Sequence, residues 1–146
     1  MQLSTLDLAT KQVTTLSSLT DKLPVANGAS NWPGTDDTIA LVTQGKGDWH
    51  PGAINKLNLK TLEFEVILDN YFGRPFNSPN DLVFYKDGST IFFTDPTYGF
   101  AQNFKPKPQL GNYVYAFDLK SKIVRVDADG FKKPNGIAFS PDYKTA

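Results

Sequence analysis

Two asparagines, Asn80 and Asn135, are the residues of this sequence best suited to bind a metal ion. Each directly follows a proline, and the two stand 55 residues apart in matching stretches of sequence. The amide oxygen of asparagine is a hard, neutral ligand, and Ca²⁺ accepts about six to eight oxygens in irregular geometry. Asparagine after proline is also a common turn residue that bonds its own backbone. The pattern by itself therefore allows either a metal ligand or a structural turn.

Other side chains near these positions carry groups that can exchange a proton. Asp81, whose carboxylate can accept a proton, follows Asn80 directly. Asp95 stands between a threonine and a proline, where we expect a turn cap rather than a pocket acid. Tyr98 follows that turn, where an aromatic ring either roofs a pocket or packs. His50 lies in a glycine- and proline-rich loop, and we expect it to be solvated there.

An internal repeat indicates which elements position these side chains. The pattern apolar residue, Asp or Asn, Leu, any residue, Thr or Ser begins at residues 6, 57 and 117, with apolar or β-branched residues around it. Each copy is typical of a strand, a tight polar turn and a second strand. We therefore expect antiparallel strand pairs over residues 53–68, 80–94 and 113–126, with almost no helix.

A second repeating unit alternates with these hairpins and predicts the fold. Residues 79–87 match residues 134–142 without a gap, and a fainter copy begins at Asn27. A period near 50 residues with about four short strands is typical of a β-propeller blade, whose first strand lines the central channel. The predicted fold class is all-β, a β-propeller, with Asn80 and Asn135 facing the channel. Propellers have roughly four to eight blades, so we expect residues 1–146 to form a partial propeller domain of under three blades, truncated at both ends.

Composition argues against several classes of partner. Lysine and arginine number 15 against 15 aspartates and glutamates, so no net charge attracts nucleic acid. No apolar run approaches the roughly 18 residues that a membrane span needs, and the absence of cysteine excludes disulfides and zinc–thiolate sites. We expect no nucleic acid, no membrane and no obligate protein partner. The first residues lack the character of a signal peptide, but a leader upstream stays possible, so the compartment is left open.

Three ordered motifs, at residues 76–83, 91–99 and 133–142, resemble the gluconolactonase / senescence-marker-protein / luciferin-regenerating-enzyme-like family. The resemblance is greatest to its fungal lactonohydrolase branch. It implies a six-bladed propeller with a divalent metal, usually Ca²⁺, held by a Glu near the N-terminus, two Asn and a later Asp. Asn80 and Asn135 match the two asparagines, whereas the Glu and the late Asp have no counterpart here. Asp81 matches an acidic residue lining the pocket, and Ser78 stands where some animal members carry a substrate-binding arginine.

The activity implied by this resemblance is metal-assisted hydrolysis of a small-molecule lactone. Ca²⁺ as a Lewis acid would polarise the lactone carbonyl for attack by water, with Asp81 as a possible helper. Because both carboxylate ligands are missing, we expect the isolated chain to be inactive. A non-catalytic propeller that binds metal or another ligand, and a truncated product without activity, are the alternatives. If the metal site forms, the amides of Asn80 and Asn135 should lie within roughly 8 Å of each other.

Overall fold

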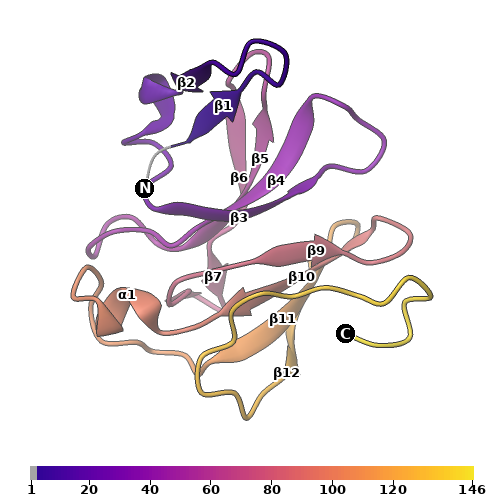
Figure 1. Cartoon of the computed structure of the whole chain (residues 1–146). Helices are drawn as coiled ribbons and strands as arrows, with labels where there is room; N and C mark the ends of the chain where they lie inside the picture. The colour runs from indigo at the N-terminus through magenta and orange to yellow at the C-terminus, as the bar shows by residue number, and fades with distance from the viewer. Residues whose placement is uncertain (1–2) are drawn as a thin grey trace.

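The structure, a computed structural model, describes residues 3–146 and is built almost entirely from β-strands (Figure 1). The strands are β1 Ser4–Leu6, β2 Val13–Thr15, β3 Ala26–Asn31, β4 Thr38–Thr43, β5 Ala53–Asn58, β6 Phe64–Leu68, β7 Asn70–Tyr71, β8 Arg74–Pro75, β9 Leu82–Phe84, β10 Thr90–Asp95, β11 Tyr113–Asp118 and β12 Val124–Ala128. Among the described residues, helix is confined to a 3₁₀ turn at Ser17–Leu19 and to α1, Tyr98–Ala101.

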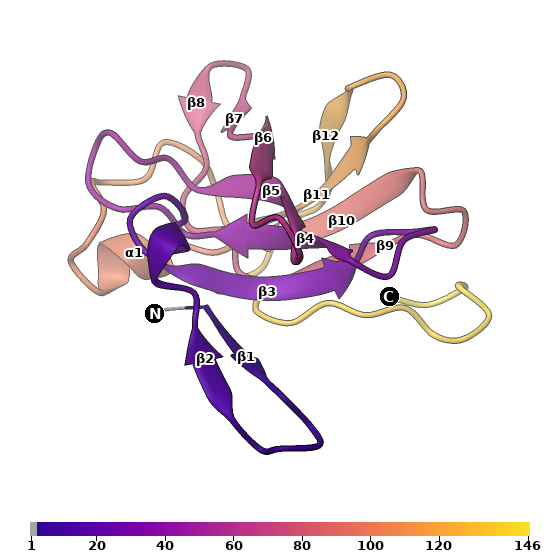
Figure 2. The same cartoon turned by 90° about the horizontal axis from the view of Figure 1, so that it is seen from above.

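Two antiparallel sheets of four strands form the body of the molecule. The first has the order β3-β4-β5-β6, and the second repeats it as β9-β10-β11-β12. The first strands of the two sheets lie side by side, joined by the Gly28 N–H, which donates to the Asn80 carbonyl at 2.9 Å (Figures 1 and 2). Four-stranded sheets that meet along their first strands are successive blades of a β-propeller. The predicted all-β propeller of under three blades is confirmed.

The three predicted hairpins are present, and one local hydrogen-bond pattern shapes all their turns. The paired strands are β1–β2, β5–β6 and β11–β12. In each turn the side-chain Oδ1 accepts two backbone N–H groups at 2.7–2.9 Å, from the residues two and three positions ahead; these side chains belong to Asp7, Asn58 and Asp118. Every copy of the repeat has Asp or Asn at this position because only a short side chain with such an oxygen closes this turn.

The strand pairs expected over residues 53–68, 80–94 and 113–126 are also confirmed, with β9–β10 as the middle pair. An aromatic core lies between the two sheets, where Phe76, Phe93 and Tyr115 pack at 5.2 Å between each pair of ring centroids. A second, aliphatic core includes Leu19, Leu23, Leu41 and Leu57 and covers the outer side of the first sheet. The aromatic core, which has residues of both sheets, holds the two blades together, whereas the aliphatic core packs the N-terminal segment on the first blade.

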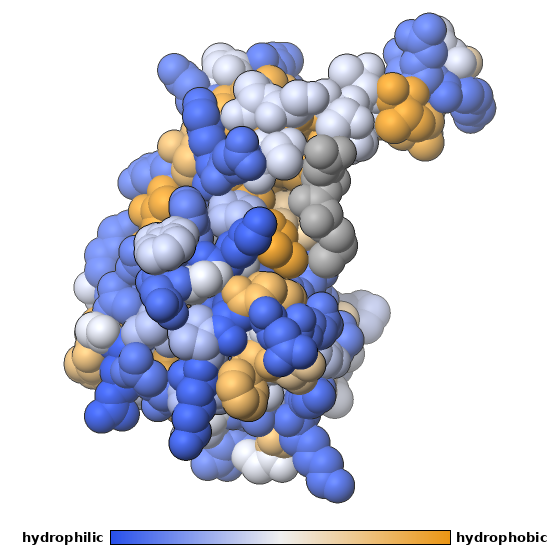
Figure 3. All heavy atoms as spheres, turned by 90° about the vertical axis from the view of Figure 1, so that its left-hand side faces the viewer, coloured by the Kyte–Doolittle hydropathy of each residue, from blue (hydrophilic) through white to orange (hydrophobic). Residues whose placement is uncertain are grey.

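One face of the molecule gathers the segments that precede the first strands and the loops that follow the second strands. On the left of Figure 1, β3 and β9 begin near α1 and the loop over residues 96–112. Figure 3 looks onto this face, which is mostly hydrophilic with scattered apolar groups. Within residues 3–146, no helix is both long and apolar enough to cross a membrane.

Candidate functional site

Thr94, a buried residue of β10, connects the backbones of the two candidate metal-binding asparagines. Its carbonyl accepts the Asn80 N–H at 3.0 Å, and its hydroxyl donates to the Asn135 carbonyl at 2.6 Å. The same hydroxyl accepts the N–H of Asp81 at 3.2 Å. The structure therefore brings Asn80, Asp81 and Asn135, which come from two successive blades, around one residue.

Asp81 joins the inner segments of successive blades. Its Oδ1 accepts the N–H of Leu82 at 2.9 Å, and its Oδ2 accepts the N–H of Ile137, in the next blade, at 3.0 Å. On its other side lies Gly28 of β3, where a Cβ atom would come within 2.7 Å of the Asp81 Cα. Glycine is required there because the two backbones approach so closely. Asp81 is half-buried, and each oxygen keeps a second lone pair; its catalytic role stays a prediction.

The side chains of Asn80 and Asn135 present the kind of oxygen that a hard cation binds. Asn80 is 7% exposed, and its amide has no hydrogen-bond partner within residues 3–146. The Nδ2 of Asn135 donates to the Tyr98 hydroxyl at 3.1 Å, which leaves the Oδ1 of Asn135 free. Neither amide is used up by its own turn, so the residues fit Ca²⁺ as two neutral ligands. That they bind a metal, and lie within roughly 8 Å of each other, stays a prediction.

The acidic side chains of the described residues do not form a metal-binding cluster by themselves. No group of three or more Asp, Glu, His or Cys within residues 3–146 is arranged to hold a metal ion. Ca²⁺ takes about six to eight oxygens, and its affinity rises with the number of charged ligands. The two asparagines can therefore be only part of a larger ligand set.

Asp95, at the end of β10, binds backbone N–H groups, as expected for a turn cap. These N–H groups, however, belong to an earlier segment of the chain and not to the turn that follows Asp95. Its carboxylate is 0% exposed and accepts the N–H of Asn77 at 2.9 Å and that of Ser78 at 2.7 Å. Burial is the main influence on this group and raises the pKa of Asp95 to about 7, although both hydrogen bonds oppose the rise. The cap thus belongs to a loop whose Ser78 precedes Asp95 by 17 residues.

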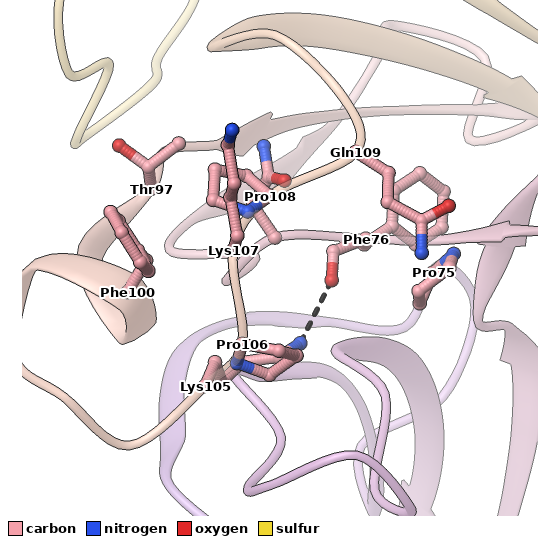
Figure 4. Close-up of a pocket in the computed structure, with 10 residues that line it drawn as sticks. Pro75, Phe76, Thr97, Phe100, Lys105, Pro106, Lys107, Pro108 and Gln109 are labelled. Carbon is pink, nitrogen blue, oxygen red and sulfur yellow. Dashed lines mark hydrogen bonds between the residues drawn. The ribbon is translucent and has the colours of Figure 1, made fainter.

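Lys105 holds the same loop from its other side (Figure 4). Its Nζ donates to the carbonyl of Phe76 at 2.8 Å, and burial lowers the pKa of Lys105 to about 8. A cavity of about 30 Å³ beside this bond is lined by residues of the 75–77 and 97–109 segments. It has room for water and not for a lactone ring. This polar cluster is therefore structural support and not a substrate pocket.

The structure gives Ser78 and His50 different environments, one buried and one exposed. Ser78 is 0% exposed; its hydroxyl donates to the Asn77 carbonyl at 2.6 Å and accepts the Gly99 N–H at 2.7 Å. It therefore does not replace the substrate-binding arginine that some relatives carry at this position. His50 is exposed in its loop, as predicted.

Three residues that support the site were not singled out from the sequence: Gly28, Thr94 and Lys105. The first two had a detectable signal, because Gly28 follows Asn27 in the faint third copy of the blade repeat and Thr94 lies within the second family-like motif. Lys105 had none, since nothing in a lysine between two loop residues indicates burial.

Comparisons with known proteins agree on one family. The family described as the SMP-30/Gluconolactonase/LRE-like region matches residues 1–146. A gluconolactonase of Zymomonas mobilis is 36% identical over 124 residues, which are 82% of this chain and 34% of that protein. The lactonohydrolase oryL of Aspergillus oryzae is 34% identical over 116 residues, which are 75% of this chain and 26% of that protein.

Solved structures give the same fold. A crystal structure assigned to the gluconolactonases superposes with a TM-score of 0.75 at 23% identity, over 92% of this chain and 43% of that chain. A gluconolactonase of Xanthomonas campestris gives a TM-score of 0.69 at 28% identity, over 82% and 38% of the two chains. The 146 residues thus span about a third of the first curated relative and about two fifths of the solved structures.

Proposed function

Because the chain belongs to the SMP-30/gluconolactonase/LRE-like family, we propose that it carries part of the active site of a lactone hydrolase. The observation that carries the proposal is the convergence of Asn80, Asp81 and Asn135 on Thr94. The curated relatives are a gluconolactonase and a lactonohydrolase, which supports a small-molecule lactone as the substrate class.

Asn80 and Asn135 would hold a divalent cation, Ca²⁺ by the chemistry of their amide oxygens. When bound, the cation supplies a Lewis acid that polarises the lactone carbonyl and stabilises the oxyanion. The chain itself contributes orientation: Thr94 fixes the backbones of both asparagines, and Tyr98 holds the Nδ2 of Asn135. The Oδ1 of Asn135 then remains available to coordinate the cation.

Asp81 would help to orient the attacking water. One lone pair on each carboxylate oxygen accepts a backbone N–H, from Leu82 and Ile137. The second lone pair remains able to accept a proton from a water molecule that adds to the carbonyl carbon. These two backbone bonds also fix the carboxylate, so that it need not reorient when the reaction begins.

The ligand count predicts that these residues need further carboxylates to work. Two neutral oxygens, with Asp81 nearby, should bind Ca²⁺ only in the millimolar range, as the weakest natural calcium modules do. We therefore expect the 146-residue chain to show no hydrolysis of aldonolactones or aromatic lactones in a pH-stat assay. A chimera in which these residues replace the matching segment of the Zymomonas mobilis gluconolactonase should bind Ca²⁺ more tightly and hydrolyse lactone.

Substitution in this chimera tests the two asparagines. Asn80→Ala and Asn135→Ala should each abolish hydrolysis and weaken calorimetric Ca²⁺ binding, whereas Asn31→Ala, an exposed residue at the far end of β3, should change neither. Undiminished activity in Asn135→Ala would contradict the assigned site. Calcium binding without turnover in the chimera would instead favour a non-catalytic binding propeller.

A further inference from the structure

The loop before Asn80 has no regular structure, yet several of its polar groups bond to other segments of the chain. Residues 77–80 form no strand or helix. The Asn77 side chain donates to the Gly111 carbonyl at 2.9 Å, while Ser78 bonds Gly99 and Lys105 bonds the carbonyl of Phe76. All of these partners belong to the 96–112 loop that follows β10. The loop before Asn80 is therefore held in place by contacts to a later segment.

The last two residues of β10 hold both ends of this short loop. Asp95 accepts the N–H groups of Asn77 and Ser78, and Thr94 accepts the N–H of Asn80. Between them lies Pro79, which is buried and whose ring fixes its φ angle. Few free torsions remain between the carboxylate of Asp95 and the side chain of Asn80. The position of Asn80 therefore depends on the Asp95 carboxylate at the start of the loop together with the Thr94 carbonyl at its end.

The choice of a carboxylate is informative because burying one is costly. Asp95 is 0% exposed, and burial raises its pKa. A charged carboxylate in this position therefore lowers the stability of the fold compared with a neutral group. Above about pH 7, where Asp95 is ionised, its carboxylate accepts two N–H groups with its two oxygens, whereas an asparagine amide offers one oxygen and would turn an NH₂ group toward the second donor. The double acceptor fixes the loop in one conformation.

We propose that Asp95 is a positioning residue, which fixes the metal ligand Asn80 by holding the backbone of Asn77 and Ser78. The inference rests on the proposed function for its consequence, since an ordered Asn80 is needed only if its amide binds a ligand. Loss of a supporting contact of this kind weakens metal binding about 10- to 100-fold in other sites.

The test uses ¹⁵N NMR of the 146-residue chain at pH 8, where Asp95 is ionised, with and without CaCl₂. In the metal-free protein, the Asn77 and Ser78 amides should exchange more slowly with solvent than exposed amides, and the Asn80 side-chain NH₂ group should give one sharp pair of proton signals, called here the Asn80 signal. Asp95→Asn should speed exchange at both amides and broaden or split the Asn80 signal. It should also weaken Ca²⁺ binding, followed at that signal, by about tenfold or more.

Asp118→Asn is the matched control, because Asp118 also accepts two backbone N–H groups but does so in an exposed hairpin turn. It should leave the Asn80 signal and its calcium response unchanged. If Asp95→Asn does not fold, Asp95→Glu provides a second variant; it keeps a carboxylate but moves both oxygens by one methylene from the Asn77 and Ser78 N–H groups, and it should loosen the same loop.

The outcomes separate this inference from the proposed function. An Asn80 signal that stays sharp and titrates equally in Asp95→Asn, or in Asp95→Glu if that variant is needed, overturns the positioning role and leaves the metal site standing. An unmodified chain whose Asn80 signal ignores tens of millimolar CaCl₂ counts against the metal site. In that case the exchange and linewidth of the metal-free protein still decide the role of Asp95.

Discussion

Asp95 and Lys105 are opposite charges that the fold places on two sides of one buried loop. Burial raises the pKa of Asp95 to about 7 and lowers the pKa of Lys105 to about 8, while the attraction between them opposes both changes. Each group is thus harder to ionise in the folded chain than in the unfolded one. This cost is offset because both side chains form hydrogen bonds with buried backbone groups of the loop: Asp95 with two N–H groups and Lys105 with a carbonyl.

This pair predicts how stability depends on pH. Between about pH 4 and 7 the folded chain keeps a proton on Asp95 that the unfolded chain has released, so the free energy of unfolding should fall as the pH rises. Between about pH 8 and 10.5 the unfolded chain keeps the Lys105 proton that the folded chain has lost. The free energy of unfolding should therefore rise again with pH over this second range. In each of the two ranges the change is at most about 1.4 kcal/mol per pH unit.

Urea unfolding across this pH range measures the effect. Lys105→Met should flatten the rising limb above pH 8, and Lys60→Met, which removes an exposed lysine paired with Asp37, should leave the curve parallel to that of the unmodified chain. Parallel curves for both variants would mean that Lys105 is not buried as the structure places it.

At the scale of single elements, the hairpin turn is the unit that the chain repeats. In all three copies the last turn residue has a left-handed backbone, with φ of 59° at Lys11, 58° at Leu62 and 61° at Lys122. Side chains other than glycine, asparagine and aspartate adopt this conformation at a cost of about 1 kcal/mol. The turns form nonetheless, because the aspartate or asparagine at their start bonds two backbone N–H groups.

Glycine substitution should therefore have opposite effects at two positions of one turn. Lys122→Gly relieves the left-handed conformation and should raise the free energy of unfolding by about 0.5 kcal/mol. Lys120→Gly lies in the same turn but does not have a positive φ, so it only adds freedom to the unfolded chain and should lower stability by about 0.5–1 kcal/mol. Urea midpoints compare the two; equal changes in the same direction would refute the explanation.

At the scale of the whole molecule, the site exists only where successive blades meet. Asp81 reaches Ile137 in the segment after the second sheet. That segment is held against the sheet by aromatic contacts, with Phe139 at 5.1 Å from Phe92 and 5.3 Å from Tyr85 between ring centroids. The position of Asn135 therefore depends on aromatic packing several residues farther along the chain.

Phe139→Ala should release this segment without unfolding the sheets. Loss of the aromatic contacts, each worth about 0.5–1.5 kcal/mol, should speed hydrogen exchange at the Ile137 amide and leave the amides of β10 protected. Phe72→Ala, which removes an aromatic ring that is 84% exposed, is the control and should change neither. Exchange at Ile137 that stays slow in Phe139→Ala would show that the hydrogen bonds to Asp81 and Thr94 hold the segment without the aromatic contacts.

The sequence by itself determined the blades and their hairpins. The strand pairs and the turns at Asp7, Asn58 and Asp118 depend on side chains that bond backbone two or three residues away, so the repeat contains all that is needed to predict them. The family-like motifs likewise single out Asn80 and Asn135 by residue type and spacing alone. Such local patterns can be recognised in a linear sequence because every partner is a near neighbour.

Only the tertiary structure decided what holds these residues. Asp95 bonds backbone 17 residues earlier, Lys105 bonds a carbonyl 29 residues earlier, and Thr94 bonds a carbonyl 41 residues later. Each contact forms because packing of one blade on the next brings distant loops together and excludes water from between them. A residue's immediate neighbours do not encode such contacts, so the partners of Thr94 and the burial of Lys105 could not be predicted from the sequence.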